Sequence, residues 1–186
     1  MSGGTVPLRL ISLILLFSLI PPARASYVAP KQIWTNKWDN CFAAAGARYQ
    51  IEPILLKAIS AAESSLKPGA NNINKDKKTG KTSSTDYGLR QINSTHIPKL
   101  RNMGVKKKSE ELITKPCLNI HIGSWIMARH FQICGVSWNC IGSYNAGFSK
   151  DRHETREQYP NKTWRTHRDM KGIGLPGKGG RQCRQS

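Results

Sequence analysis

Residues 53–66 read PILLKAISAAESSL and carry the clearest helix signal in the chain. Proline suits the first helical position, and apolar residues follow on one side at Leu55, Leu56, Ile59 and Ala62. Glu63 follows Ile59 by four residues, so the helix turns its carboxyl onto this apolar face. Burial and the negative end of the helix dipole both raise the pKa of such a carboxyl, as a general acid requires. The alternative interpretation is a buried glutamate paired with a lysine or arginine.

Three more helices are predicted from apolar residues that recur every three or four positions. Their inward faces are Trp38, Cys41, Phe42, Ala45 and Tyr49; then Leu118, Ile122, Trp125, Ile126 and Ile133; then Trp138, Ile141 and Tyr144. Between the helices, residues 71–85 are polar and predict a loop holding a short hairpin, whose second arm runs from Tyr87 to Ile92. The chain is therefore expected to be mostly helical.

The N-terminus predicts a signal peptide. An apolar run from Leu8 to Ile20 is too short to span a bilayer comfortably, and Ala23-Arg24-Ala25 suits a signal peptidase. Cleavage is expected between Ala25 and Ser26, with an uncut anchor as the alternative. No other segment approaches transmembrane length, so export to the periplasm is expected.

The charge balance is strongly basic, with 29 Lys and Arg against 11 Asp and Glu, or +18. Signal cleavage would remove Arg9 and Arg24 and no acid, which leaves +16. Such a charge favours a nucleic acid, a membrane surface or an anionic cell wall, and export weakens the first. A solvated basic surface is the alternative. The tail after Met170 is rich in glycine and basic residues and is expected to be disordered.

Five cysteines favour disulfides in an exported chain. Cys134 and Cys140 are close enough to join two helix ends, which makes Cys41 and Cys117 a plausible long-range pair and leaves Cys183 over. No C-x-x-C pair, His-x-x-x-His spacing or glycine-rich phosphate loop is present, so no metal or cofactor is expected.

Four short motifs stand in a fixed order along the chain. They are Ala62-Glu63-Ser64, then DYGLRQIN at 86–93, NIHIG at 119–123 and SYNAG at 143–147. Together they resemble the soluble lytic transglycosylase family, in particular its small members that accompany type III and type IV secretion, conjugation and pilus machines. The resemblance covers about residues 38–148. It implies a lysozyme-like, goose-type, two-lobed helical domain with a glycan cleft and a small hairpin beside it.

With the signal peptide at 1–25, the chain is expected to continue as a catalytic domain at 26–150 and a basic C-terminal extension at 151–186. The resemblance places the catalytic glutamate on Glu63. Softer substrate-binding roles fall on Ser64, Gln91, Tyr144 and Asn145. Core packing with a satisfied hydroxyl is the alternative for Tyr144, and a polar helix end without a role is the alternative for Ser64. Arg90 departs from the family, which usually has Met or Phe there, and it could change a sugar subsite or form a salt bridge.

The implied reaction is cleavage of the β-1,4 bond between N-acetylmuramic acid and N-acetylglucosamine in peptidoglycan, with closure to a 1,6-anhydro product. Glu63 would act first as acid and then as base. Residues 84–94, STDYGLRQINS, also resemble the hairpin of c-type lysozymes, where the position of Asp86 holds a second carboxylate. Hydrolysis is therefore the alternative reaction, although Asp86 also suits a turn. A non-catalytic peptidoglycan-binding module is a further alternative. The expected partners are glycan strands and components of a secretion, conjugation or pilus machine, without nucleic acid.

Overall fold

The computed structural model describes residues 34–105 and 109–173, which belong to one compact unit. The predicted signal peptide, Cys183 and the tail beyond residue 173 lie outside the described residues. Within them the chain forms α-helices α1 (Asp39–Tyr49), α2 (Pro53–Ser64), α3 (Ile97–Asn102), α4 (Glu111–Thr114), α5 (Pro116–Cys134), α6 (Trp138–Ala146) and α7 (His153–Met170). Short 3-10 turns lie at Ser94–His96 and Lys150–Arg152. None of the described helices is long and apolar enough to cross a membrane.

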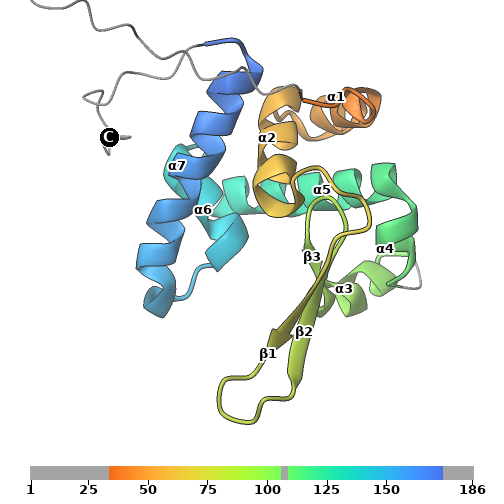
Figure 1. The fold of residues 1–186 in the computed structure, drawn as a ribbon, viewed down its shortest axis with the longest axis vertical. Helices are drawn as coiled ribbons and strands as arrows, with labels where there is room; N and C mark the ends of the chain where they lie inside the picture. The colour runs from red at the N-terminus through yellow and green to blue at the C-terminus, as the bar shows by residue number, and fades with distance from the viewer. Residues whose placement is uncertain (1–33, 106–108, 174–186) are drawn as a thin grey trace, which may run out of the picture. The chain divides into compact units, whose positions relative to one another are not determined.

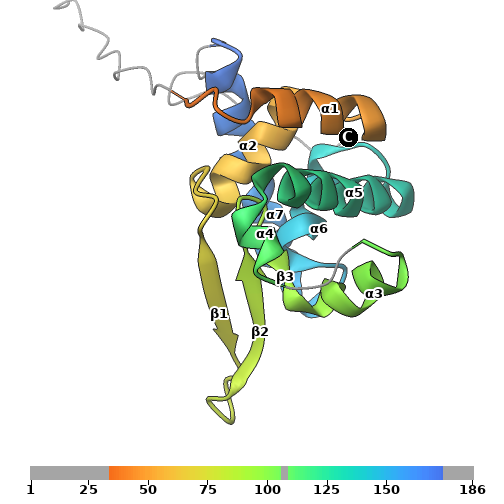
Figure 2. The ribbon, with the colours of Figure 1, turned by 90° about the vertical axis from the view of Figure 1, so that its right-hand side faces the viewer.

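The core lies between α1, α2 and α5, and Figure 2 shows α1 lying along α5. Its fully buried side chains include Phe42 of α1, Leu56 and Ile59 of α2, and Ile120 and Met127 of α5. These residues recur at three and four along their helices, so burial of one stripe from each helix stabilises all three. The predicted disulfide between Cys41 and Cys117 is present and joins α1 to the start of α5.

The four predicted helices are confirmed as α1, α2, α5 and α6. One detail of the third was wrong, because Ile133 is 65% exposed rather than inward. Ile133 follows Ile126 by seven residues and shares its face. The smaller apolar cluster on that face, which includes Leu100 of α3 and Leu112 of α4, ends at Ile126. The helical period was therefore right, but among the described residues the apolar cluster on this face does not extend to Ile133.

The predicted hairpin exists, but its second arm was placed wrongly. Strand β1 (Asn71–Lys75) pairs antiparallel with β2 (Thr82–Tyr87), and β2 pairs with the short β3 (Ile92–Asn93). Residues 88–91 form a turn, in which Gly88 has φ +73° and Gln91 has φ +46°. A side chain at Gly88 would lie 2.4 Å from the Leu112 carbonyl oxygen, so glycine is required there. The hairpin of β1 and β2 extends away from the helices (Figure 1).

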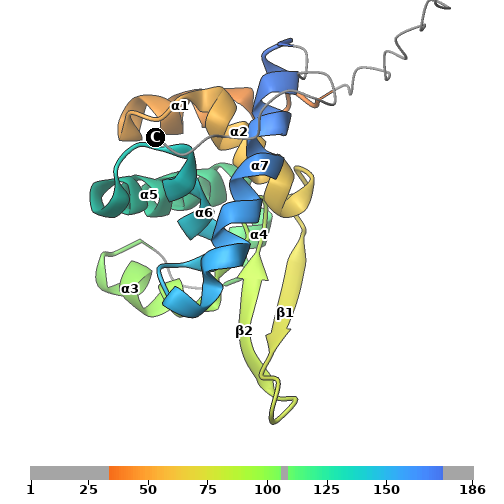
Figure 3. The same ribbon diagram turned by 90° about the vertical axis from the view of Figure 1, so that its left-hand side faces the viewer.

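Helix α7 was not predicted and lies within residues 151–186, the range expected to form an extension beyond the catalytic domain. In the structure α7 packs against α2 and α6 (Figures 1 and 3). Its interior Pro160 has no N–H to donate to the carbonyl of Arg156. That carbonyl oxygen faces Gly142 of α6 so closely that a Cβ there would lie 1.9 Å away. The packed domain therefore reaches well beyond residue 150.

Candidate active site

A polar cleft of about 920 Å³ lies between the helices and the sheet. One side, here called the helical wall, presents Glu63, Ile126, His130, Ser143, Tyr144 and Asn145. The other side, the sheet wall, presents Asn72, Asn74, Ser84, Asp86, Gln91 and Asn93. Two other hollows on the described domain are mostly apolar, and neither is lined by Glu63 or Asp86. The cleft thus gathers five of the six residues that the sequence proposes for catalysis or substrate binding.

Glu63 lies in the last turn of α2 and is half-buried at the cleft. Its carboxyl accepts a hydrogen bond of 2.5 Å from the hydroxyl of Tyr159. Burial raises the pKa of Glu63, and the nearby charge of Asp86 adds to that rise. The Tyr159 hydrogen bond and the charges of Arg90 and Lys162 act in the opposite direction. The net rise is the direction expected from the helix pattern, and it favours a neutral acid that can donate a proton.

Tyr159 of α7 is the site residue that the sequence did not reveal. Burial is the main cause that raises its pKa, and the nearby Glu63 raises it further, so its hydroxyl keeps its proton and remains a donor. One turn later on α7, Lys162 Nζ donates to the backbone oxygen of Ala62 at 2.8 Å. These two contacts hold α7 against the end of α2 at Ala62 and Glu63.

Tyr144 of α6 lines the cleft, and its hydroxyl is bonded to Arg90. The hydroxyl donates to the Arg90 backbone oxygen at 3.0 Å and accepts from Arg90 Nε at 3.3 Å. Burial raises the pKa of Tyr144. The hydroxyl of Tyr144 is therefore satisfied, as the packing alternative expected, and the residue also lines the cleft. Arg90 itself is fully buried and is not among the side chains that line the cleft.

Asp86 occupies the middle of the sheet wall and is bonded to three asparagine amides. Asn74 donates to Oδ2 at 2.8 Å, Asn93 donates to Oδ1 at 2.7 Å, and Asn72 approaches Oδ2 at 3.4 Å. The strand register explains the cluster, because Asn72 and Asn93 pair directly with Asp86 on either side and Asn74 lies two residues along β1. Both carboxyl oxygens are thus fixed as acceptors on the cleft surface.

The remaining predicted residues divide between the cleft and the core. Gln91 lines the cleft, and its amide donates to the Gly88 carbonyl at 2.8 Å. Asn145 is exposed at the cleft edge. Ser64 does not reach the cleft: it is buried, and its hydroxyl donates to the Leu89 carbonyl at 2.8 Å. This bond joins the end of α2 to the turn before β3, and a substrate contact for Ser64 stays a prediction.

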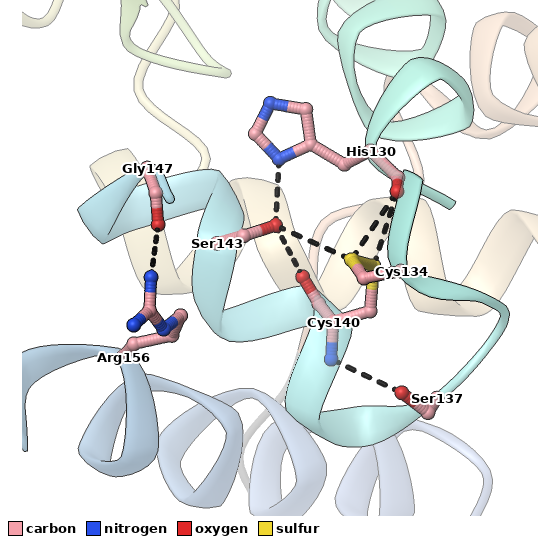
Figure 4. Close-up of a disulfide and its surroundings, with 7 residues drawn as sticks. All are labelled: His130, Cys134, Ser137, Cys140, Ser143, Gly147 and Arg156. Carbon is pink, nitrogen blue, oxygen red and sulfur yellow. Dashed lines mark hydrogen bonds between the residues drawn. A yellow bond between two sulfur atoms is a disulfide. The ribbon is translucent and has the colours of Figure 1, made fainter. Parts of the chain in front are cut away.

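A histidine and a serine next to the second disulfide complete the helical wall (Figure 4). The predicted disulfide between Cys134 and Cys140 joins the end of α5 to α6. Beside it, His130 Nδ1 lies 2.7 Å from Ser143 Oγ, which also donates to the Cys140 carbonyl at 2.6 Å. Burial lowers the pKa of His130, with further lowering from His96 and Arg129, so a neutral imidazole faces the cleft. No sequence motif marked this residue. Among residues 34–105 and 109–173, no three His, Cys, Asp or Glu side chains gather as a metal site would require.

Glu63 and Tyr159 both lie within a stretch of the chain that matches a known protein family. The family model described as "Transglycosylase SLT domain" matches residues 40–166, which is most of the described chain and includes Tyr159. The chain belongs to this family. The match ends within α7, so the SLT domain here includes the helix that supplies the hydrogen bond to Glu63.

Two relatives share much of the SLT domain sequence. The chain is 48% identical over 124 residues to a peptidoglycan-binding-like protein of Escherichia coli O157:H7. This alignment covers 67% of this chain and 74% of that protein. It is 39% identical over 141 residues to the invasion protein IagB of Salmonella typhimurium (strain LT2). That alignment covers 76% of this chain and 83% of IagB. Both alignments are long enough to include most of the SLT domain.

Among solved structures, the SLT domain resembles lytic transglycosylase Slt from Pseudomonas aeruginosa, determined as an inactive mutant. The TM-score is 0.56 with 17% sequence identity, over 77% of this chain and 26% of that one. The chain therefore spans about a quarter of the length of Slt. The likeness confirms the mostly helical, lysozyme-like fold.

Proposed function

We propose that this SLT domain is a peptidoglycan lytic transglycosylase in which Glu63 serves as both acid and base. The observation that carries the proposal is the half-buried Glu63 carboxyl in a long polar cleft, bonded to Tyr159, with its pKa raised by burial. Family membership supports the same reaction class. Peptidoglycan is the substrate we propose, since the resemblance to lytic transglycosylases implies it and one relative is named a peptidoglycan-binding-like protein.

In the first step, neutral Glu63 would donate its proton to the bridging oxygen as the bond from muramic acid C1 breaks. The glucosamine then leaves with a free 4-hydroxyl. In the second step, the Glu63 carboxylate would accept the proton of the muramic acid 6-hydroxyl while that oxygen bonds to C1. The product is a 1,6-anhydro sugar, and Glu63 regains its proton without consuming water.

The two walls of the cleft suit a sugar chain in different ways. On the sheet wall, Asn72, Asn74 and Gln91 present amide groups that can bond sugar hydroxyl and acetamido groups. On the helical wall, the aromatic side chains of Tyr144 and His130 line the cleft and could pack against a pyranose ring. Tyr159, behind Glu63, would hold the carboxyl in place during both proton transfers.

Lysozyme-type hydrolysis is the second candidate, and Asp86 is the observation that favours it. Its carboxyl lies on the opposite wall, close enough to raise the pKa of Glu63, and is held by Asn74 and Asn93. Such a pair of carboxyl groups is what an ordinary glycosidase uses. The anhydro reaction needs only Glu63, so the two candidates give different products.

Attachment to the cell wall is proposed to depend on the basic surface. Lys75, Lys77, Lys78 and Lys81 are all exposed at the far end of the β1–β2 hairpin, and Lys75 also lines the cleft. The peptide stems of peptidoglycan carry carboxylates that these lysines could bind, and such contacts weaken as salt rises. Binding to isolated sacculi should therefore decrease with ionic strength, and salt-independent binding would contradict this account.

The setting we propose is the periplasm, where the enzyme opens the wall locally for a secretion, conjugation or pilus apparatus. Two disulfides fit an extracytoplasmic compartment. The relative IagB is named an invasion protein, which supports a role beside such an apparatus.

The test is mass spectrometry of the muropeptides released from purified sacculi by the wild type and by Glu63→Gln. We expect anhydro-muramic products from the wild type and none from the variant. Glu154→Gln, on the exposed start of α7, is the matched control and should behave like the wild type. Reducing-end products would favour the hydrolase. No release by the wild type, with binding retained, would favour a peptidoglycan-binding module.

A further inference from the structure

Arg90 is a fully buried arginine in the turn between β2 and β3. Its guanidinium donates to the Leu56 carbonyl of α2 at 3.0 Å and to the Gly123 carbonyl of α5 at 3.2 Å. Its Nε donates to the Tyr144 hydroxyl at 3.3 Å, and the guanidinium carbon lies 4.7 Å from the centre of the Tyr144 ring. One side chain thus connects three helices that surround the cleft.

The backbone is shaped to admit this side chain. A Cβ at Gly123 would lie 2.6 Å from Arg90 Cβ and 2.8 Å from Nε, so a larger residue on α5 would displace the arginine. The Arg90 backbone N–H donates to the Asn119 side chain at 2.8 Å, which fixes the start of the side chain as well as its end. The guanidinium therefore has one defined position.

No carboxylate among the described residues forms an ion pair with Arg90; its side-chain partners there are two carbonyl oxygens and a phenol. A buried cation without a counter-charge is unfavourable, and neutral acceptors compensate for only part of that cost. Its field also acts over a longer distance inside the protein than in water. Burial raises the pKa of Glu63, Tyr144 and Tyr159, and the charge of Arg90 opposes that rise in all three, so its field reaches Glu63 and both tyrosines.

We propose that Arg90 is a positioning residue for Glu63, because its buried guanidinium bonds α2, the helix that carries Glu63, fixes Tyr144 in the same cleft and adds a permanent positive charge between them. This inference rests on the proposed role of Glu63 in proton transfer. Burial alone would keep Glu63 protonated but would hinder release of its proton, since the carboxylate form would be too unfavourable. The charge of Arg90 stabilises the carboxylate between the two steps.

Other groups also face Glu63, and the test must separate them from Arg90. Tyr159 and Lys162 approach from α7, and Asp86 approaches from β2. Lys162 is exposed, so solvent screens its charge, whereas Arg90 is fully buried. Arg90 is therefore the cation whose removal should change Glu63 most.

The experiment is a carboxyl NMR titration of protein labelled with carbon-13 at the glutamate side chains, with Glu63→Gln used to assign the Glu63 signal. Arg90→Met removes the charge and all three side-chain bonds, and Arg90→Lys keeps the charge. We expect the Glu63 midpoint to move to higher pH in Arg90→Met and to stay near the wild-type value in Arg90→Lys. Lys67→Met, which removes an exposed charge just beyond α2, should leave the midpoint unchanged.

Activity on sacculi gives a second readout. A general acid must be protonated, so activity falls as the pH rises through the pKa of Glu63, and this alkaline limb should move upward in Arg90→Met. A merely structural role would lower activity at every pH without moving the limb. If Arg90→Met does not fold, Arg90→Gln, which also lacks the charge, replaces it in both measurements.

An unchanged Glu63 midpoint in the folded uncharged variant would overturn the inference. The titration requires no substrate, so its outcome is independent of the muropeptide assay. A midpoint that moves in a protein releasing no muropeptides would sustain the electrostatic link and reject the proposed function. If the wild type releases anhydro products but the Glu63 midpoint does not move, the proposed function is sustained and the electrostatic link between Arg90 and Glu63 is rejected.

Discussion

The helical wall and the sheet wall of the cleft each carry one carboxyl group, and the two groups have different neighbours. Glu63 lies over the apolar core with one hydroxyl donor, and burial raises its pKa. Asp86 accepts from asparagine amides on both of its oxygens and stands on a polar sheet. Burial at the end of α2 raises the pKa of Glu63, which suits a group that donates a proton and takes it back. Hydrogen bonds from two strands hold Asp86 in place, which suits a group that only accepts hydrogen bonds.

The backbone of each wall explains the difference. Strands β1 and β2 alternate polar residues on the face that meets the cleft, so amides from neighbouring strands converge on Asp86. Helix α2 ends abruptly after Ser64, because Ser65 and Leu66 have left-handed φ values of 54° and 60°. Buried Leu66 packs into the core and holds this unusual backbone in place. The end of α2 is therefore fixed by packing, and the sheet wall by hydrogen bonds.

The largest expected effect comes from exchanging each carboxyl for its amide. Glu63→Gln should lower the rate of muropeptide release by about 10² to 10⁴, because proton transfer is lost. Asp86→Asn should lower it by roughly fivefold, the value of about one hydrogen bond to the sugar. Rates would be measured on the same sacculi. Equal losses in the two variants would make Asp86 a second reacting carboxylate and favour hydrolysis.

The next effect concerns the packing of the helical wall. Gly142→Ala would place a Cβ 1.9 Å from the Arg156 carbonyl oxygen, a backbone atom that cannot turn aside. We expect a loss of about 3 kcal/mol in the free energy of unfolding, measured in urea, and a loss of activity as α7 moves Tyr159 from Glu63. Gly69→Ala is the matched control, since no atom lies within 4 Å of its added Cβ. If Gly142→Ala and Gly69→Ala have the same free energy of unfolding, then α6 and α7 can move apart without loss of stability.

The helical wall was partly predictable from sequence, and the reason is periodicity. Leu56, Ile59 and Phe42 recur at helical spacing, and that spacing alone put Glu63 on the buried face. Helix α7 gave no comparable signal, because its 18 residues include few large apolar side chains and an interior proline. Tyr159 could be found only from the way α7 packs on α2.

The sheet wall and Arg90 were harder to predict for a different reason. Strand β2 is polar on both faces, so it lacks the alternation of apolar and polar residues that marks a strand in sequence. An arginine in a short motif suggests a surface charge, yet Arg90 is buried because carbonyl groups from two helices accept its N–H groups. Such acceptors depend on the assembled fold and leave no local pattern.

A smaller effect should follow from weakening the sheet wall at Asn93. Its side chain donates to Asp86 at 2.7 Å and accepts from the Thr95 backbone N–H at 3.0 Å, so it also caps the turn after β3. Asn93→Ala should cost about 1 to 2 kcal/mol in urea unfolding. Asn72→Ala, whose amide lies 3.4 Å from Asp86 on an exposed strand, is the control and should change stability by less than about 0.5 kcal/mol. Similar losses in the two variants would mean that Asp86 is not held mainly from β3.

The smallest expected effect is a pH dependence of stability that separates buried Glu63 from an exposed glutamate. The pKa of Glu63 is raised above its ordinary 4.5 by burial, so the folded protein holds this proton more tightly than the unfolded chain. The stability it contributes is complete below pH 4.5 and is lost as the pH rises through the folded pKa. Glu63→Gln should therefore gain Tm over the wild type as the pH rises from about 4 to about 8.

Glu52 provides the control with the opposite sign. The hydrogen bond from Lys171 is the main cause that lowers the pKa of Glu52, and His167 lowers it further. Its contribution is present above pH 4.5 and is lost as the pH falls through the lowered pKa, so Glu52→Gln should lose Tm at neutral pH and approach the wild type in acid. Both differences would come from thermal melts over the same pH series. A Tm difference for Glu63→Gln that is flat with pH would mean that Glu63 titrates as it does in the unfolded chain, and the contrast between the two walls would then lie only in their hydrogen bonds.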